Sequence, residues 1–246
     1  DELLNICEES DITLLEDCCE SHGATFKTEK IGNFGKASSF SFYYGHHMTT
    51  IEGGMVCTED DEVYEKLLLI RSHGLLRELP KYMQKKYRDR KVDENFTFVV
   101  PGYNVRSTDL NAVLGQMQLK DLDDHNNIRR NNFDVFANGL SKDKFYTDFK
   151  LEGNSSFCFP VITKSTQEDT LALRKYLESQ GVETRPIIAG NLYEHPFMDR
   201  VNQYRHDKNA KVIHQNGFYV GNNHAVNVGD VTWLVERLNA WETGEQ

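Results

Sequence analysis

The chain has 246 residues, of which 39% are hydrophobic, and a formal net charge of −10 at neutral pH. Its length and apolar content suffice for one large domain or two modest ones, and the acidic balance argues against nucleic acid as a partner, because phosphate binding needs clustered Lys and Arg. No apolar run reaches the length of a membrane span and no signal peptide opens the sequence, so we expect a cytoplasmic protein without membrane contact.

The cysteines predict no covalent or metal framework. They form an odd set without a Cys-x-x-Cys pair, at Cys7, Cys18, Cys19, Cys57 and Cys158. Zinc sites and disulfide frameworks are recognised by such spacing, so we expect reduced thiols.

The chain opens with a helix end over residues 1–10, followed by a short buried strand over 12–15 that stops at Glu16 and Asp17. This order is typical of an α/β unit, in which ligands bind beyond the carboxyl ends of parallel strands. Asp17 therefore stands in a favoured position for chemistry, although a carboxylate at a strand end is more often a cap or a surface group.

A turn with two adjacent imidazoles comes next. Residues 40–54 read Phe-Ser-Phe-Tyr-Tyr-Gly-His-His-Met-Thr-Thr-Ile-Glu-Gly-Gly. The alternation of Phe with polar residues predicts a strand up to residue 44, and Gly45 lets the backbone turn sharply beside a ligand. A second strand is expected over 54–58. His46 and His47 lie between the two strands.

Caps and apolar spacing predict the other elements. Asp60 and Asp61 open a helix, and the basic stretch 77–95 is expected to be a loop or a surface arm. A long helix begins after Ser107 or Thr108 and runs on towards residue 140. We place a domain boundary near residue 122, giving domains 1–122 and 123–246. In the second domain we expect strands at 157–162 and 182–185, and helices at 170–179, 207–216 and 230–241.

Three ordered motifs resemble those of a known family. Residues 17–23 read Asp-Cys-Cys-Glu-Ser-His-Gly, residues 41–46 read Ser-Phe-Tyr-Tyr-Gly-His, and residues 102–106 read Gly-Tyr-Asn-Val-Arg. With them the chain resembles the DegT/DnrJ/EryC1/StrS sugar aminotransferases, which use pyridoxal phosphate. The resemblance implies an aspartate-aminotransferase-like α/β fold (fold type I). Residues 1–122 would be the carboxyl-terminal part of the large cofactor-binding domain, without its amino-terminal part, and 123–246 a small α/β domain.

The resemblance also assigns cofactor contacts. It implies that Asp17 pairs with the pyridine nitrogen, keeping it protonated so that the ring accepts electrons. Glu20 stands where the family has a glutamine near the ring hydroxyl, and Ser41 matches the serine that contacts the phosphate. Asn104 could be a local turn residue by composition; the resemblance matches it to an asparagine that reaches the cofactor phosphate of a partner subunit, which implies a homodimer with shared active sites.

His46 stands where the family has the lysine that bonds covalently to the cofactor. Imidazole forms no stable Schiff base, so ordinary transamination is disfavoured, and the chain looks like the sugar 3-dehydratases of the family, in which histidine is the base. This implies a pyridoxamine phosphate cofactor regenerated by L-glutamate, and removal of the 3-hydroxyl from a nucleotide-linked 4-keto-6-deoxy sugar. Imidazole, with an ordinary pKa of about 6.5, suits proton abstraction near neutral pH.

His47 is the rival for the role of base. Neighbouring residues of an extended segment face opposite sides, so we expect His47 in the wall of the site, among the substrate contacts. Arg185 and Asn191 resemble the small-domain segment near a GDP-sugar, where the planar guanidinium of Arg185 would clamp the diphosphate. A surface ion pair is the simpler interpretation of Arg185.

A metal held by His22, His46 and His47 is not expected, because no further ligands have the required spacing. No Cys-x-Cys pair suggests an iron–sulfur cluster. Two other functions stay open besides dehydration. The chain could be a pyridoxal-phosphate-dependent nucleotide-sugar aminotransferase, or a truncated family member without catalytic activity.

Overall fold

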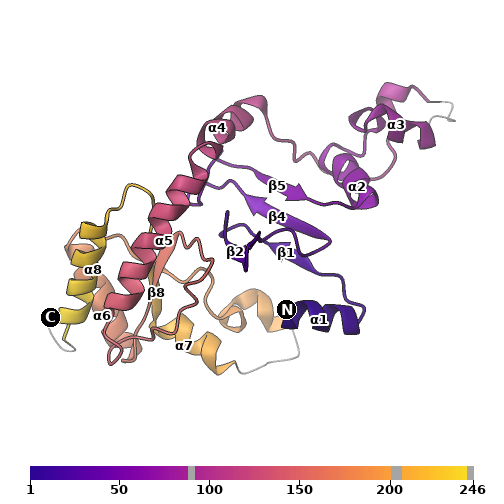
Figure 1. Cartoon of the computed structure of the whole chain (residues 1–246). Coiled ribbons are helices and arrows are strands. Elements are labelled where there is room, and N and C mark those ends of the chain that lie inside the picture. Colours follow the sequence, from indigo (N-terminus) through magenta and orange to yellow (C-terminus); the bar gives the residue numbers. More distant parts are fainter. Residues whose placement is uncertain (88–91, 201–206, 243–246) are drawn as a thin grey trace. The chain divides into compact units, whose positions relative to one another are not determined.

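The structure is a computed structural model of the chain and describes residues 1–87, 92–200 and 207–242. The chain divides into two compact units, residues 1–122 and 123–246. Figure 1 shows their elements in the order of the sequence. The assignment of these units to a large and a small domain stays a prediction. No helix among the described residues is long and apolar enough to cross a membrane.

The first unit is built on a three-stranded sheet with the order β1-β4-β5. Its strands are β1 (Leu15–Asp17), β4 (Ala37–Ser41) and β5 (Gly54–Cys57). β1 runs parallel to β4, and β5 runs antiparallel to β4 (Figure 1). A parallel pair needs a crossover connection, and here that connection contains a small hairpin of β2 (Thr25–Phe26) and β3 (Glu29–Lys30). The carboxyl ends of β1 and β4 therefore meet at one edge of the sheet.

Two predicted strands are displaced. The first strand begins at Leu15 instead of residue 12, because the amide of Ile12 donates to the Cys7 carbonyl (2.8 Å) at the end of the preceding helix. It is also exposed rather than buried, with Leu15 66% exposed. The second strand ends at Ser41 instead of residue 44, because Phe42 already hydrogen-bonds across the base of the histidine turn.

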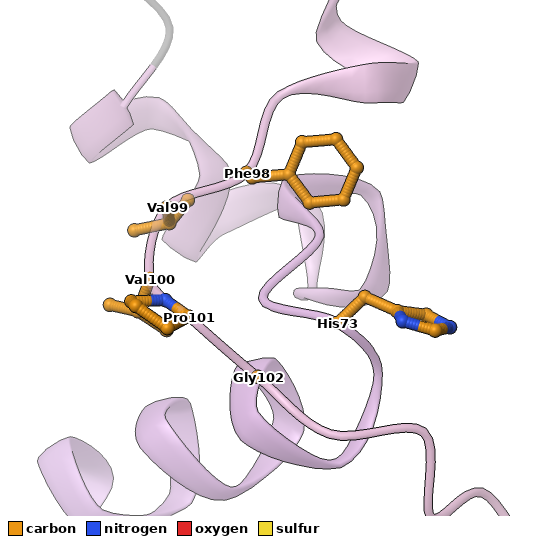
Figure 2. Close-up of a pocket in the computed structure, with 6 residues that line it drawn as sticks. All are labelled: His73, Phe98, Val99, Val100, Pro101 and Gly102. Carbon is orange, nitrogen blue, oxygen red and sulfur yellow. The ribbon is translucent and has the colours of Figure 1, made fainter.

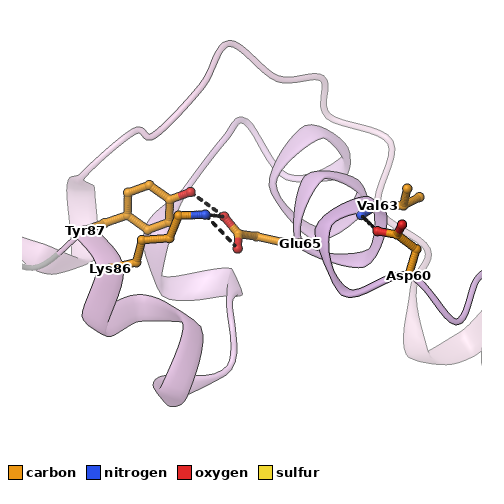
Figure 3. A network of polar contacts seen from close by, with 5 residues as sticks. All are labelled: Asp60, Val63, Glu65, Lys86 and Tyr87. Atoms are coloured by element: carbon orange, nitrogen blue, oxygen red, sulfur yellow. Dashed lines mark hydrogen bonds and ion pairs between the residues drawn. The ribbon is translucent and has the colours of Figure 1, made fainter.

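The helices of the first unit are α1 (Glu2–Glu9), α2 (Asp61–Arg71), α3 (Lys81–Gln84) and α4 (Asp109–Leu119), with the 3-10 turns η1 (Leu76–Glu78), η2 (Lys85–Tyr87) and η3 (Glu94–Phe96). The predicted cap of α2 is confirmed, since Asp60 accepts from the amide of Val63 at 2.9 Å (Figure 3). For residues 77–95, predicted to be a loop or a surface arm, the loop alternative is wrong in the described part, which contains η1, α3, η2 and η3; residues 88–91 lie outside the described residues.

The segment after α2 folds because it has apolar side chains of its own. A small cluster packs there: Leu68, Leu69, Leu76, Leu79 and Met83. Figure 3 shows how Glu65 of α2 also binds this segment through polar contacts. Its carboxylate accepts from the hydroxyl of Tyr87 and from Lys86 Nζ, the latter at 3.3 Å.

The single long helix predicted after residue 107 is two helices, α4 (Asp109–Leu119) and α5 (Leu122–Gly139). Thr108 caps α4 by accepting from the amide of Asn111 at 3.3 Å, so the cap prediction is confirmed. The apolar side chains that suggested a buried face of α4 are largely exposed, with Leu110 81%, Val113 54% and Met117 63% exposed.

The second unit has a three-stranded antiparallel sheet with the order β6-β8-β7. Its elements are α5, β6 (Cys158–Ile162), α6 (Gln167–Ser179), β7 (Arg185–Pro186), η4 (Leu192–Glu194), η5 (Pro196–Arg200), α7 (Lys208–Asn216), β8 (Gly217–Gly221) and α8 (Val228–Ala240). Five predicted elements correspond to β6, α6, β7, α7 and α8 with shifted ends. The central strand β8 is absent from the prediction, although Asn216-Gly217, at the junction where α7 ends and β8 begins, is a turn signal.

The core of the second unit is aromatic and aliphatic. Its fully buried members come from α5, the sheet, α6 and α8, and include Phe136, Phe159, Val161, Leu177, Phe218 and Leu238. Phe136 is 0% exposed, and its ring centroid lies 4.9 Å from that of Phe159. Burial of such side chains supplies most of the stabilisation of a unit of this size.

Replacement of Phe136 by Ala should destabilise the second unit by about 3–5 kcal/mol, because it leaves a cavity in a packed core. The matched control is Phe197→Ala, since Phe197 is 62% exposed in the same unit; that change should cost about 0.5 kcal/mol or less. Urea unfolding curves of the two variants test this, and equal losses would contradict the assignment of Phe136 to the core.

Candidate cofactor and base site

Asp17 ends β1 with its carboxylate held by neighbouring groups. Its Oδ1 accepts from the amide of Cys19 at 3.1 Å and from the hydroxyl of Ser39, the residue opposite on β4, at 3.4 Å. Hydrogen bonds from the Cys19 side chain and backbone, with smaller contributions from Ser39 and His46, lower the pKa of Asp17. Because the residue is also exposed, it offers a fixed negative charge at the carboxyl end of the strand.

Glu16 has a different task although it precedes Asp17. Successive side chains of a strand point to opposite faces, and the Glu16 carboxylate accepts three backbone hydrogen bonds from the crossover loop. The donors are the amides of Gly32 (2.7 Å), Phe34 (2.7 Å) and Gly35 (2.6 Å). Glu16 thus ties the loop that leads into β4 back to β1. Sequence reasoning missed this role; the signal was a carboxylate facing a glycine-rich loop.

Ser41 ends β4 on the same face as Ser39, because alternate residues of a strand share a face. Its Oγ accepts from the amide of Tyr43 at 3.2 Å, so the hydroxyl proton can be donated to a ligand. The chain then turns tightly, with the amide of His46 donating to the Tyr43 carbonyl at 3.1 Å.

The His46 ring lies on the Asp17 side of this turn. Its Nε2 is 3.5 Å from Oε1 of Glu20, and the His46 side chain is 13% exposed. The edge of the ring meets Tyr43, with centroids 5.5 Å apart. His46 also acts electrostatically on Asp17. The structure therefore brings together four of the predicted residues: Asp17, Glu20, Ser41 and His46.

His47 lies in a different environment. It is 5% exposed and stacks on His22, with ring centroids 5.3 Å apart. His22 in turn meets Phe40 and Phe42 edge-on. The two adjacent histidines thus have different partners, a carboxylate for His46 and an aromatic cluster for His47. The expectation that His47 contacts substrate stays a prediction.

Asn104 lies beside the end of α2. It forms a bridge with Ser72, and the flanking amides of Tyr103 and Val105 donate to the carbonyls of Ile70 and Arg71. The side chain is exposed. The role of Asn104 in a partner's site stays a prediction.

The other predicted substrate residues belong to the second unit. Arg185 is exposed and pairs with Glu183, its Nη2 lying 2.8 Å from the carboxylate. Asn191 is 7% exposed; its Oδ1 accepts from the amide of Tyr193 at 3.2 Å, which caps η4. Its own amide donates to Nδ1 of His214 at 3.2 Å. Both side chains have local partners that a bound nucleotide would have to supplement or displace.

A separate open pocket lies in the first unit. The pocket has a volume of about 510 Å³ and lies between His73 and the segment 98–102. Figure 2 shows the side chains that line it. The lining residues include no carboxylate and none of the four residues gathered around His46. Across the described ranges, no group of three or more His, Cys, Asp or Glu side chains is arranged to hold a metal ion.

Residues 1–239 match the model of the DegT/DnrJ/EryC1/StrS aminotransferase family, and the chain belongs to this family. GDP-4-keto-6-deoxy-D-mannose 3-dehydratase of Escherichia coli O55:H7 is 39% identical over 249 residues, an alignment that covers 97% of this chain and 63% of the relative. The enzyme of the same name from Yersinia pseudotuberculosis is 38% identical, with 90% and 58% covered. The chain thus spans about three fifths of the length of these relatives.

Solved structures agree with the sequence comparison. The E. coli 3-dehydratase with bound hydrated pyridoxal phosphate superimposes with a TM-score of 0.88 at 35% identity, covering 97% of this chain and 63% of that one. A mutant form of GDP-4-keto-6-deoxymannose-3-dehydratase holds GDP-perosamine (TM-score 0.87, 35% identity), and another structure of that enzyme holds a trapped adduct of pyridoxal phosphate and glutamate (TM-score 0.86, 34% identity); they cover 97% of this chain and 64% of theirs. The predicted α/β fold of this family is confirmed.

The hydrogen bond from the Cys19 side chain is the largest cause of the low pKa of Asp17. Cys19→Ala should therefore raise that pKa towards its ordinary value, because the carboxylate loses a donor to its charged form. A group with a lowered folded pKa stabilises above its unfolded pKa, and this stability is lost as pH falls. The free energy of unfolding of the variant should accordingly fall less on acidification below pH 4 than that of the unsubstituted protein.

The measurement is an NMR titration of the Asp17 carboxyl carbon. Cys57→Ala is the matched control, because Cys57 is an exposed thiol on β5 and is not among the groups that shift Asp17. An unchanged Asp17 titration in the Cys19 variant would show that the thiol does not hold the carboxylate.

Proposed function

We propose that the protein removes the 3-hydroxyl group from a nucleotide-linked 4-keto-6-deoxy sugar, with pyridoxal or pyridoxamine phosphate as cofactor and His46 as the base. One observation carries the proposal. The turn beside the anionic Asp17 presents an imidazole paired with Glu20, where the family resemblance calls for a lysine. The relatives at 39% and 38% identity bear the name of this dehydratase.

The described residues fit the cofactor. Asp17 is an exposed carboxylate with a lowered pKa, suited to hold the proton on a pyridine nitrogen. The Ser41 oxygen already accepts from the Tyr43 amide, which leaves its O–H to donate to a phosphate. When bound, the cofactor supplies an amine that joins the sugar's keto carbon and a ring that takes up electrons.

Glu20 lies beside the His46 ring. Its carboxylate lies 3.5 Å from Nε2 of the ring. When the ring takes up a proton, the carboxylate stabilises the positive charge that results. We therefore propose that Glu20, which stands where the family has a glutamine, assists His46 as the base.

The substrate proposal follows the relatives. One holds GDP-perosamine and one an adduct with glutamate, so we propose a GDP-linked sugar, L-glutamate as amino donor, and Arg185 with Asn191 and His47 as nucleotide-sugar contacts. A homodimer in which Asn104 completes the partner's site belongs to the same proposal. The sugar's 3-hydroxyl leaves as water, and the two electrons that reduce its carbon come from glutamate. Glutamate takes up one water and becomes 2-oxoglutarate and ammonia, so atoms and electrons balance.

The decisive assay incubates the protein with pyridoxal phosphate, L-glutamate and GDP-4-keto-6-deoxymannose. We expect one ammonia and one 2-oxoglutarate for each deoxygenated sugar. His46→Asn should lower turnover by roughly 10²–10⁴-fold, because general base catalysis contributes about that much. His73→Asn is the matched control, since His73 lines the other pocket, and should leave turnover unchanged.

Each other outcome of this assay has a definite meaning. A sugar product that retains nitrogen, without free ammonia, would establish the aminotransferase alternative. Absence of both turnover and cofactor binding, even at high pyridoxal phosphate, would establish a non-catalytic family member.

His46→Lys should have the opposite chemical signature. A primary amine in this turn can bond to the cofactor aldehyde, so reduction with borohydride should attach a pyridoxyl group to residue 46, while dehydration should collapse. Peptide mass spectrometry locates the group. If the variant's peptide that contains residue 46 carries no pyridoxyl group, this residue does not face the cofactor.

A further inference from the structure

Helix α4 turns one face of three residues towards the segment that follows the histidine turn. Asn111, Gly115 and Gln118 are spaced i, i+4 and i+7, so they share this face. A Cβ on Gly115 would lie 3.2 Å from the Thr50 methyl. The helix backbone therefore comes close enough for short amide side chains to reach the main chain of residues 49–52.

Gln118 pairs with Thr49 in both directions. Its Oε1 accepts from the Thr49 amide at 3.0 Å, and its Nε2 donates to the Thr49 carbonyl at 2.6 Å. Nε2 also donates to the Leu114 carbonyl of its own helix at 3.0 Å, which orients the side-chain amide. In an antiparallel sheet, two opposed residues exchange two N–H···O hydrogen bonds. Here the side-chain amide of Gln118 makes the same pair of hydrogen bonds with the main chain of Thr49.

Asn111 holds the next residues. Its Nδ2 donates to the carbonyls of Thr50 (2.7 Å) and Glu52 (3.3 Å), while its Oδ1 accepts from the Thr108 amide in the helix cap. The residue between these two carbonyls, Ile51, has φ 73°. A β-branched residue in the left-handed region is strained and persists only where its surroundings enforce it.

The held segment is the base of the histidine turn. Phe42 donates to the Gly53 carbonyl at 2.9 Å and accepts from the Thr50 amide at 2.9 Å, which closes the loop that contains His46. Thr50 is therefore bonded to Phe42 on one side and to Asn111 on the other. Without the bonds from α4, residues 49 and 50 would rely on their own bonds to the Phe42 carbonyl, from the Thr50 amide and from the Thr49 hydroxyl.

We propose that Asn111 and Gln118 are positioning residues that hold the main chain of residues 49–52 and thereby fix the imidazole of His46 against Glu20 and Asp17. The consequence for catalysis rests on the proposed function of His46 as the base. The effect of Asn111 and Gln118 on the geometry of the turn is independent of that function and can be measured separately.

Gln118→Met tests the proposal, because it keeps the volume and removes both bonds to Thr49. Gln116→Met is the matched control on the same helix, since Gln116 is exposed. In the Gln118 variant alone, hydrogen exchange of the Thr49 amide should accelerate about tenfold or more, and the imidazole NMR signals of His46 should shift. Turnover number should fall roughly 10²-fold with KM for the nucleotide sugar unchanged, because a misplaced base affects the chemical step.

Gln118→Glu is the second variant, in case the first does not fold. It keeps the acceptor for the Thr49 amide and loses the donor to the carbonyl, so its effects should be intermediate. Unchanged exchange and unchanged His46 signals in the Gln118 variants would overturn the proposal, as would faster exchange with full turnover. If the unsubstituted protein has no turnover, the proposed function fails, and the exchange and NMR signals still decide whether α4 fixes the turn.

Discussion

The parallel pairing of β1 with β4 is the constraint on which the candidate site depends. It sets Asp17 opposite Ser39, so that a carboxylate and a row of hydroxyls end at the same edge of the sheet. The crossover that this pairing requires is itself fastened to β1 through Glu16, whose carboxylate accepts three loop amides. Two adjacent acidic residues thus serve two faces of the strand: Glu16 fastens the crossover loop, and Asp17 places its charge at the end of β1.

The same division recurs in the turn. His46 is paired with the carboxylate of Glu20, whereas His47 stacks on His22 within an aromatic cluster. Two adjacent histidines thus have different surroundings, because one faces a carboxylate and the other faces aromatic rings.

The family and the residues around His46 could be read from the sequence, because ordered motifs identify them before any coordinates are known. The ends of helices and strands could not be read from the sequence, because they depend on hydrogen bonds made by single residues. Ile12 donates to the Cys7 carbonyl at the end of α1, and β1 begins only at Leu15. Phe42 bonds to Gly53, and β4 ends at Ser41. Both shifts depend on single backbone hydrogen bonds, which hydrophobic periodicity does not reveal.

The role of α4 was hidden for another reason. Its apolar residues dominated the interpretation of the sequence, and most of them prove to be exposed, Leu110 at 81%. The informative residues were Asn111, Gly115 and Gln118, a polar and small stripe at helical spacing. Such a stripe indicates a backbone approached closely by another backbone, and only tertiary structure shows which one.

The ion pair of Arg185 with Glu183 is local, so a charge pattern alone cannot assign Arg185 to a nucleotide.

The bonds between Gln118 and Thr49 join residues 69 positions apart. The chain between β5 and α4 therefore acts as a connecting loop, whose length contributes to the free energy only through the entropy of closing it. Doubling a flexible loop costs only about 0.6 kcal/mol, and the part after α2 carries its own small core. The geometry around His46 therefore depends little on the length of this segment, whose proposed chemical residue, Asn104, lies near its end. It depends strongly on helix register, because a shift of a single residue in α4 would separate both side-chain amides from the turn.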